Sequence, residues 1–331
     1  MKLSFVTVCY IILNTILQVL VSATVNEYSE IKEFIKNEAK RLGFVKTGFA
    51  RPDMVDQSIA FQNWLDKNYH EDMKWMENHI EKRLDPRKLM DDCKTIIVFA
   101  ANYHNQVNYS DVKISRYVLG DDYHIVLKKK LRKLLEAIQQ KFPQIEGRFF
   151  TDTAPILERY WAQKSGIGWQ GKNTNLITRD YGSYIFLAEM LINIELEADQ
   201  EHADFCGSCA KCLDSCPTNA FVDAYQLNSN KCISYLTIEK RADFSPEESK
   251  LIDNNLYGCD ICQEVCPWNK FARETEIEEF KNRLHLINKN LDFWSSIDEK
   301  TYQQTLKNSA MKRTKLTGIK RNSRAIKSNR I

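Results

Sequence analysis

The sequence lacks an internal repeat of solenoid length, and only two short cysteine-rich stretches resemble each other, which excludes a repeat architecture. It also has little net charge, +3 at pH 7 over 331 residues, so the overall charge indicates no class of partner. Hydrophobic residues at 43% and charged residues at 27% are ordinary for a globular protein with a sizeable core. The length fits one large domain or two of ordinary size.

Acidic residues are missing from the C-terminal segment. Lys307 to Ile331 contain nine Lys or Arg and no Asp or Glu. Such a segment suits a polyanion such as RNA, and the alternative is a solubilising, partly frayed terminus, which composition alone favours. A predicted helix over 124–142 also carries a basic face. This face is either an RNA contact or a solvated surface, and the solvated surface is favoured. Its residues are Lys128, Lys129, Lys130, Arg132 and Lys133.

The N-terminal segment lacks the paired arginines of signals that export folded, cofactor-loaded proteins. Residues 1–24 nevertheless combine one early lysine with a long apolar run and a small-residue end, Val-Ser-Ala, which is typical of a secretory signal. The alternatives are a membrane anchor and a start codon assigned too far upstream. These three interpretations can be distinguished by the function of the remaining chain.

Strands and helices are predicted to alternate up to about residue 200, which indicates an α/β or α+β core. Residues 202–270 form a cysteine-rich region, and the remainder is helical and then basic. We therefore expect a leader at 1–24, a substrate-binding domain at 25–200, a ferredoxin-like domain at 201–272 and a helical basic region at 273–331. The predicted helices cover 28–42, 57–69, 124–142 and 156–165, and the predicted strands cover 44–50, 95–101, 148–151 and a pair, 175–178 with 184–192, around the turn 180–182.

Eight of the ten cysteines gather in residues 206–266, within the stretches CGSCAKCLDSCP and CDICQEVCP and at one position between them. Disulfide scaffolds are usually small secreted domains, and zinc sites prefer C-x2-C pairs without a close third and fourth thiol. The first stretch instead reads C-x2-C-x2-C-x3-C-P, the bacterial ferredoxin spacing for a [4Fe–4S] cluster. The eight thiols therefore predict two such clusters, while the isolated Cys93 is expected to be a small core residue.

The ferredoxin spacing also predicts which cysteines share a cluster. Three thiolates on one tight loop bind three irons of a cube, and the last cysteine of the run serves the other cluster. The second run is one cysteine short, and Cys232 supplies the missing ligand. The predicted sets are Cys206, Cys209, Cys212 and Cys266 for one cluster, and Cys216, Cys232, Cys259 and Cys262 for the other. The motif identifies the cofactor but not the reaction, because simple electron carriers share it.

A carboxylate, Asp152, lies at the end of a predicted strand in the stretch TDTAPILERYWAQKSGIGWQGKNTNLI, residues 151–177. Loops at the ends of strands in α/β proteins are where ligands usually bind. Asp152 can act as a general acid if burial raises its pKa, and the alternative is a helix cap or structural carboxylate. The pattern G-x-G-x-x-G at 166–171 follows a predicted helix rather than a strand, which excludes a dinucleotide fingerprint.

From about Glu27 to Arg330 the chain resembles the epoxyqueuosine reductase family. The resemblance rests on EAKRLGF (38–44), SRYVLGDDYH (115–124), residues 151–177, GSYIFLAEML (182–191), CGSCAKCLDSCPTNAF (206–221), CISYLTIEKR (232–241), YGCDICQEVCPWNKF (257–271) and SAMKRTKLTGIKRN (309–322). Two features depart from the family. Lys240-Arg241-Ala242 stands where His-Arg-Gly is common, which puts the local tRNA or corrinoid contact in question, and the apolar leader is foreign to the family.

The resemblance implies an oxidoreductase that completes queuosine biosynthesis, reducing epoxyqueuosine to queuosine at the wobble position of tRNA with cob(I)alamin and two [4Fe–4S] clusters. Asp152 falls at the family's proton-donor position, and Arg241 and the basic tail become candidates for tRNA contact. The corrinoid-ligand signature Asp-x-His-x-x-Gly is absent, which is compatible with a family that binds its corrinoid without a histidine on cobalt. Residues expected to line the corrinoid or active site are Tyr123, His124, Asp152, Lys172, Asn173, Ser234 and Asp260.

Two other functions fit part of the sequence. A corrinoid iron–sulfur reductive dehalogenase would explain the leader, but the missing arginine pair and the basic tail oppose it. A ferredoxin-type electron carrier would not need the 200 residues that precede the cysteines. For the reductase we expect a cytoplasmic monomer that takes electrons from a low-potential donor. The leader then reflects a misassigned start, with export as the alternative if it is a genuine signal.

Overall fold

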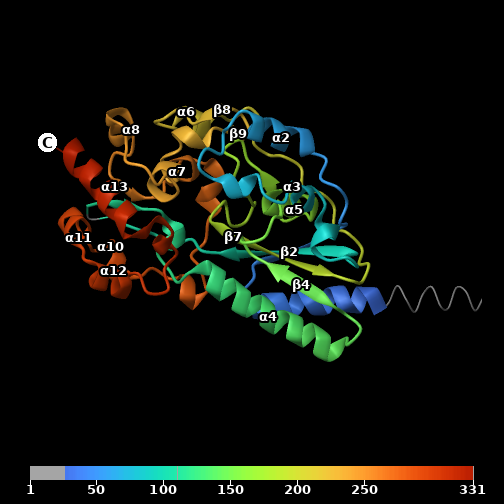
Figure 1. The fold of residues 1–331 in the computed structure, drawn as a ribbon. Helices are drawn as coiled ribbons and strands as arrows, with labels where there is room; N and C mark the ends of the chain where they lie inside the picture. The colour runs from blue at the N-terminus through green and yellow to red at the C-terminus, as the bar shows by residue number, and fades with distance from the viewer. Residues whose placement is uncertain (1–26, 110, 331) are drawn as a thin grey trace, which may run out of the picture.

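The computed structural model describes residues 27–109 and 111–330 (Figure 1). Its centre is a four-stranded antiparallel sheet in the order β1-β2-β7-β4. All eight residues of both central strands are buried. The predicted leader, residues 1–24, lies outside the described residues. The strands of this sheet are β1 (Lys46–Ala50), β2 (Thr95–Asn102), β4 (Gly147–Phe150) and β7 (Ile185–Ile192).

Helices cover both faces of the sheet (Figure 1). The helix 27–41 and α4 (Tyr123–Lys141) pack on one face through apolar residues such as Ile31, Leu127 and Leu131. On the other face, α5 (Glu158–Lys164) contributes Trp161 to a second apolar layer. Successive side chains of a strand point to opposite faces, so β7 supplies Met190 to the first layer and its neighbours in sequence to the second.

A third core joins the cysteine-rich region to the C-terminus. It contains Tyr257, Trp294, Ile319 and Ile326. α13 (Lys315–Asn329), which holds most of the basic tail, is partly buried within this core, so the interpretation of the tail as a frayed terminus is wrong. Within residues 27–109 and 111–330, no helix combines the length and apolarity needed to cross a membrane.

The remaining elements are short. The other α-helices are α2 (Ser58–Asp66), α3 (Ile80–Leu84), α6 (Lys211–Asp214), α7 (Ile233–Ile238), α8 (Pro246–Leu251), α9 (Ile261–Glu264), α10 (Leu284–Ile287), α11 (Leu291–Ser296) and α12 (Glu299–Thr305). The other strands are β3 (Lys113–Ile114), β5 (Trp169–Gln170), β6 (Leu176–Ile177), β8 (Phe221–Asp223), β9 (Gln226–Leu227) and β10 (Asn255–Tyr257). The 3-10 helices are η1 (Lys74–Met76), η2 (Pro86–Leu89), η3 (Arg116–Val118), η4 (Ser229–Lys231), η5 (Pro267–Phe271), η6 (Glu278–Phe280) and η7 (Ala310–Thr314).

One predicted pairing is wrong. The sequence analysis paired strands 175–178 and 184–192, but β6 pairs with β5, and β7 lies between β2 and β4. Only a single bridge between Thr178 and Gly182 joins the two segments. The physical reason is burial, because β7 is apolar on both faces and such a strand is stable only inside a sheet that is covered on both sides.

A buried arginine fixes the junction between α7 and α13. Arg321 donates hydrogen bonds to the carbonyl oxygens of Leu236, Lys240 and Ala242 at 2.8, 2.6 and 2.8 Å. Carbonyl groups at the end of a helix have no partner within the helix, so the guanidinium satisfies groups that would otherwise be buried unpaired. Burial lowers the pKa of Arg321 to about 10, which still leaves the side chain charged at neutral pH.

We expect Arg321→Leu to destabilise the protein by about 3 kcal/mol, because it leaves buried carbonyl groups without donors. Thermal unfolding of the purified protein measures the effect. Arg324→Leu is the matched control on the same helix, since Arg324 is 67% exposed and pairs at 3.6 Å with an exposed carboxylate, Asp243. Such surface pairs contribute little. Equal melting temperatures for the two variants would contradict the role given to Arg321.

Candidate functional site

Asp152 lies on a short loop that follows β4. The preceding residue, Thr151, is fully buried and its hydroxyl donates to the carbonyl oxygen of Leu187 at 3.0 Å. Asp152 has a φ of +53°, which non-glycine residues rarely adopt and which often marks a functional constraint. Its backbone N–H donates to Oε1 of Glu158 at 2.5 Å. The loop therefore holds the Asp152 carboxylate in a defined position at the end of the strand.

Two side chains at the start of α4 contact this carboxylate. The Tyr123 hydroxyl donates to Oδ2 of Asp152 at 2.7 Å, and Nε2 of His124 lies 3.0 Å from the same oxygen. Nδ1 of His124 lies 2.8 Å from Oδ1 of Asp122, which also caps the helix by accepting from the His124 N–H. The imidazole is therefore held between two carboxylates, and its ring orientation is fixed.

The proton of this group lies on the histidine. Burial opposes charge on His124, but the hydrogen bonds to Asp122 and Asp152 outweigh it and raise the pKa of His124 to about 9. Burial by itself raises the pKa of Asp152, yet hydrogen bonds from His124 and Tyr123 bring it below its ordinary value. The sequence analysis made a general-acid role conditional on a raised pKa, and that condition is not met. Asp152 can still deliver a proton, because His124 beside it carries one.

We use the name acid recess for the site formed by five residues, Tyr123, His124, Asp152, Glu158 and Arg159. Asp152 and Arg159 are exposed to solvent, yet burial is the largest influence on the pKa of each. Solvent thus reaches both side chains, while neighbouring protein atoms still influence their charge. A proton-bearing pair beside a tyrosine and an arginine can bind a polar group and transfer a proton to it.

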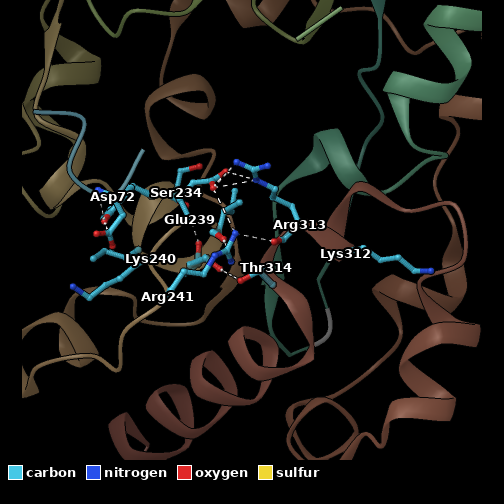
Figure 2. A network of polar contacts seen from close by, with 12 residues as sticks. Asp72, Ser234, Glu239, Lys240, Arg241, Lys312, Arg313 and Thr314 are labelled. Carbon is cyan, nitrogen blue, oxygen red and sulfur yellow. Dashed lines mark hydrogen bonds and ion pairs between the residues drawn. The ribbon is translucent and has the colours of Figure 1, made fainter. Parts of the chain in front are cut away.

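A polar network borders the acid recess (Figure 2). The Nε of Arg313 donates to both carboxylate oxygens of Glu239 at 3.0 and 3.1 Å, and Arg241 donates to the carbonyl oxygen of Arg313 at 3.1 Å. The positive charge of Arg313 also contributes to the lowered pKa of Asp152, which places the guanidinium near the acid. Figure 2 shows Lys312 pointing away from this network. The guanidinium of Arg313 on η7 therefore lies near the Asp152 carboxylate.

The first predicted group of cysteines surrounds a cavity of about 90 Å³. Lys172, Asn173 and the aromatic rings of Phe205 and Trp268 complete its lining. Four sulfurs around a partly apolar cavity match the ligand set and shelter that an iron–sulfur cube requires. The cysteines of this cavity are Cys206, Cys209, Cys212 and Cys266, which is the predicted set.

The second predicted group is also brought together. Burial, with smaller contributions from the nearby sulfurs of Cys232 and Cys216, raises the pKa of Cys259 to about 12. Burial likewise raises the pKa of Cys262 well above its ordinary value, with added contributions from Cys232 and Cys259. Buried thiols that repel one another's charge become thiolates only when a metal centre binds them. The donor set therefore fits a second cluster.

Four predicted corrinoid contacts lie beside the cysteine groups. The Lys172 ammonium donates to the carbonyl oxygen of Gly207 at 2.6 Å, and Asn173 donates to that of Cys262 at 3.2 Å. The backbone N–H of Ser234 points to the sulfur of Cys232. Asp260 accepts hydrogen bonds from the Ser115 hydroxyl and the Arg116 N–H, so internal partners occupy both of its oxygens. Their contact with a corrinoid stays a prediction.

Aromatic rings connect the second cysteine group with the acid recess. Tyr184 lies close enough to Cys262 for the sulfur to raise its pKa. Its ring contacts Tyr103 at 5.9 Å between centroids, Tyr103 contacts Phe186 at 4.3 Å, and Phe186 stacks on Tyr123 at 4.4 Å. The two parts of the site are thus joined by a continuous layer of packed side chains that excludes water.

Sequence reasoning missed three acidic residues of this site. Asp122 orients His124, Glu158 binds the Asp152 amide, and Glu189 lies buried beneath them in β7. A signal for Glu189 was present, since it is the one charged residue in the otherwise apolar strand IFLAEMLI. A lone charge at such a position needs a partner or a proton.

Two family models match the chain. One, described as "4Fe-4S double cluster binding domain", covers residues 205–269, and the other, described as "Epoxyqueuosine reductase QueG, DUF1730", covers residues 83–153. An epoxyqueuosine reductase of Leadbetterella byssophila is 43% identical over 296 residues, which are 88% of this chain and 97% of that protein. The epoxyqueuosine reductase of Vibrio cholerae is 39% identical over 295 residues, 87% of this chain and 80% of that protein.

Solved structures are also similar. One is an epoxyqueuosine reductase bound to an epoxyqueuosine-modified tRNA-Tyr stem loop, with a TM-score of 0.85 and 32% identity over 91% of this chain and 82% of that one. Another, from Bacillus subtilis, has its aspartate-bearing catalytic loop swung out of the active site. It has a TM-score of 0.85 and 31% identity over the same shares of the two chains.

Proposed function

The chain belongs to the epoxyqueuosine reductase family, and from this premise we propose how its residues carry out the reaction. The reaction reduces the epoxide of epoxyqueuosine in tRNA to the alkene of queuosine, consumes two electrons and two protons, and releases water. The observation that carries the proposal is the Asp152–His124 pair, which holds a proton in a recess joined by packed rings to the second cysteine group.

Two [4Fe–4S] clusters are bound by the two cysteine groups in the crossed arrangement. The first group would hold its cluster in the cavity that Trp268 and Phe205 help to line, and the second would hold its cluster on the cysteines near Tyr184. The clusters supply electrons one at a time from a low-potential donor. The protein's part is to shelter them and to fix their positions relative to the acid recess.

Cobalamin is the third cofactor that the family implies, and the exposed polar side chains Asp152 and Arg159 of the acid recess suit contact with a large polar group of this kind. Reduced cobalamin, when bound, supplies the electron pair that breaks the carbon–oxygen bond of the epoxide. Tyr123, His124 and Asp152 would line its site on the substrate side, and Lys172, Asn173, Ser234 and Asp260 remain predicted contacts. No histidine of the chain is assigned to cobalt.

Asp152 protonates the departing oxygen. Its own pKa is low, so at neutral pH the transferable proton resides on His124 and passes through the shared hydrogen bond to Asp152 and on to the substrate. Solvent can reload the pair for the second proton, because Asp152 is 56% exposed. Asp122 keeps the imidazole charged and correctly turned throughout.

Proton storage on His124 predicts a pH limit. The hydrogen bonds raise the pKa of His124 from 6.5 to about 9, so the stored proton is present below about pH 9 and is lost as the pH rises through that value. Asp122→Asn removes one of the two carboxylates, and we expect the alkaline limit of kcat to move down by about one pH unit. Single-turnover rates across pH measure this, and an unchanged limit would remove His124 from the proton path.

The tRNA is expected to bind at the exposed cationic side chains Arg241, Lys312 and Arg313, of which Lys312 points away from the other two (Figure 2). Arg241 and Arg313 are 43% and 49% exposed, so phosphate oxygens can reach both guanidinium groups. The relative solved with a tRNA stem loop supports a tRNA substrate for this chain. A tRNA substrate in turn favours a cytoplasmic location.

We expect Lys312→Ala to weaken tRNA binding without changing its base specificity and to reduce the salt slope of the affinity by about one, because phosphate contacts release counterions. Filter binding across salt concentrations measures both. Lys133→Ala is the matched control on α4, whose basic face was predicted to be solvated. Equal losses in the two variants would extend the interface to α4, and no loss for Lys312→Ala would exclude this residue from the interface.

Nucleoside analysis of tRNA from a strain lacking the protein tests the function directly. Epoxyqueuosine should accumulate and queuosine should disappear, and reintroducing the full chain should restore queuosine. Anaerobically reconstituted protein should bind about eight irons and one cobalamin. An unchanged nucleoside profile would reject the function, while uptake of iron without a corrinoid would favour an electron carrier.

A further inference from the structure

The carboxyl group of Glu189 is inaccessible to solvent. It lies in the middle of β7, opposite Val98 of β2 and Phe150 of β4, and it is 0% exposed. By the alternation of side chains along β7 it shares its face with Leu187 and Leu191, which belong to the apolar layer beneath α5. Burying an ionised carboxylate in such a layer without a partner is very costly, so this group has to be neutral or hydrogen-bonded.

No donor of the described protein reaches either carboxyl oxygen of Glu189. The neighbour that it does face is Glu158, at the start of α5, and two carboxylates can only accept hydrogen bonds. A bond between them forms only when one carries a proton. Burial and the adjacent Glu158 raise the pKa of Glu189 well above its ordinary value, and burial raises that of Glu158 to about 7. Glu189 is accordingly the group expected to carry the proton, and ionised Glu158 is the group able to accept a hydrogen bond from it.

Glu158 accepts a hydrogen bond from the Asp152 N–H at 2.5 Å. This bond is made to the residue with the left-handed backbone, φ +53°, at the turn of the acid loop. The three carboxyl groups therefore form a chain from the core to the surface: Glu189 in the sheet, Glu158 at the start of α5, and Asp152 in the acid recess. A change in protonation at one end can reach the other through a single side chain.

We propose that Glu189 is a positioning residue that stays protonated, donates a hydrogen bond to Glu158, and through Glu158 holds the Asp152 loop in its active position. The inference rests on the proposed role of Asp152 as the proton donor. The charged groups that face the pair are Asp152, whose charge opposes ionisation of Glu158, and Arg159, whose charge favours it. The contacting residues of β2 and β4, Val98 and Phe150, carry no charge.

Glu189→Gln and Glu189→Leu separate this role from simple packing. Glutamine keeps a permanent donor for Glu158, so we expect turnover within about threefold of wild type, whereas leucine removes the donor, and we expect kcat to fall at least tenfold with an unchanged KM for tRNA. Because a leucine in the sheet can impair folding, Glu158→Ala serves as a second variant. It removes the acceptor of the Asp152 N–H from the start of α5, and we expect the same loss of kcat.

Hydrogen–deuterium exchange of the segment around Asp152 gives a readout that does not depend on catalysis. We expect faster exchange in Glu189→Leu and Glu158→Ala and wild-type exchange in Glu189→Gln. Infrared spectra at pH 8 should show a protonated carboxyl band in the wild type that is absent from Glu189→Gln. Wild-type exchange in both disruptive variants, or no such band in the wild type, would overturn the proposal.

These outcomes are distinct from failure of the proposed function. If Asp152 were not the proton donor, Asp152→Asn would keep its turnover, yet the exchange and infrared results for Glu189 would be unaffected. If instead Glu189 had no positioning role, Asp152→Asn would lose turnover while Glu189→Leu kept both its kcat and its slow exchange. The two claims can therefore be rejected separately.

Discussion

Replacing Asp152 with asparagine is expected to lower the rate of epoxide reduction by about 10²- to 10⁴-fold, which is the usual contribution of a positioned acid. The amide can still accept the Tyr123 hydrogen bond, so the loop should keep its position, but an amide does not relay the proton of His124 to the substrate. Both clusters should remain, because Asp152 contacts neither cysteine group. Single-turnover kinetics with epoxyqueuosine-containing tRNA, alongside the iron content, measures both expectations.

A control for this variant is Asp180→Asn. Asp180 is 55% exposed and forms a surface ion pair with Lys46 at 3.0 Å, so its removal should leave turnover within about twofold. Wild-type turnover in Asp152→Asn would exclude Asp152 from the mechanism. A loss of iron in that variant would show instead that the substitution acts through the structure and not through proton transfer.

The cysteine spacing predicted two groups of thiols from the sequence, because ligands on one tight loop are constrained by short chain lengths, and the structure brings the four cysteines of the first group around one cavity. The same holds for β2 and for α4, whose boundaries differ from the predictions by one residue. In each case the information is local: a run of apolar residues, a helical period, or thiols three residues apart. The family resemblance likewise pointed to Asp152 and to its contacts Tyr123 and His124 on α4, because it rests on short sequence motifs.

Features that depend on the tertiary arrangement could not be predicted from local patterns. The basic tail had the composition of a solvated terminus, yet Arg321 is buried because it completes the end of a different helix. The pKa of Asp152 depends on His124, which is 28 residues away in sequence, and on a backbone conformation that no motif encodes. The role inferred for Glu189 depends on the position of α5 above the sheet, which no local pattern predicts. The charge state of the site is therefore a property of the fold.

The largest effect on cofactor content is expected from Cys266→Ser. Cys266 is the last cysteine of the second run, but it lines the cavity of the first group together with Cys206, Cys209 and Cys212. Removing its sulfur should therefore disrupt the cluster of the first run, lowering the iron content from about eight to about four per chain. Turnover should be lost as well, since the path from the electron donor is interrupted.

Cys216→Ser is the reciprocal test, because Cys216 belongs to the first run but its sulfur lies near Cys259. Each variant should keep one cluster, and electron paramagnetic resonance of the reduced proteins should show different remaining signals. Cys93→Ser is the control, since this buried thiol lies in an apolar layer away from both groups and should leave about eight irons. If instead each run bound its own cluster, Cys266→Ser would lose the signal of the second-run cluster. Cys216→Ser would then lose the signal of the first-run cluster. The crossed arrangement is thus decided by which of the two signals survives, and not by iron content alone.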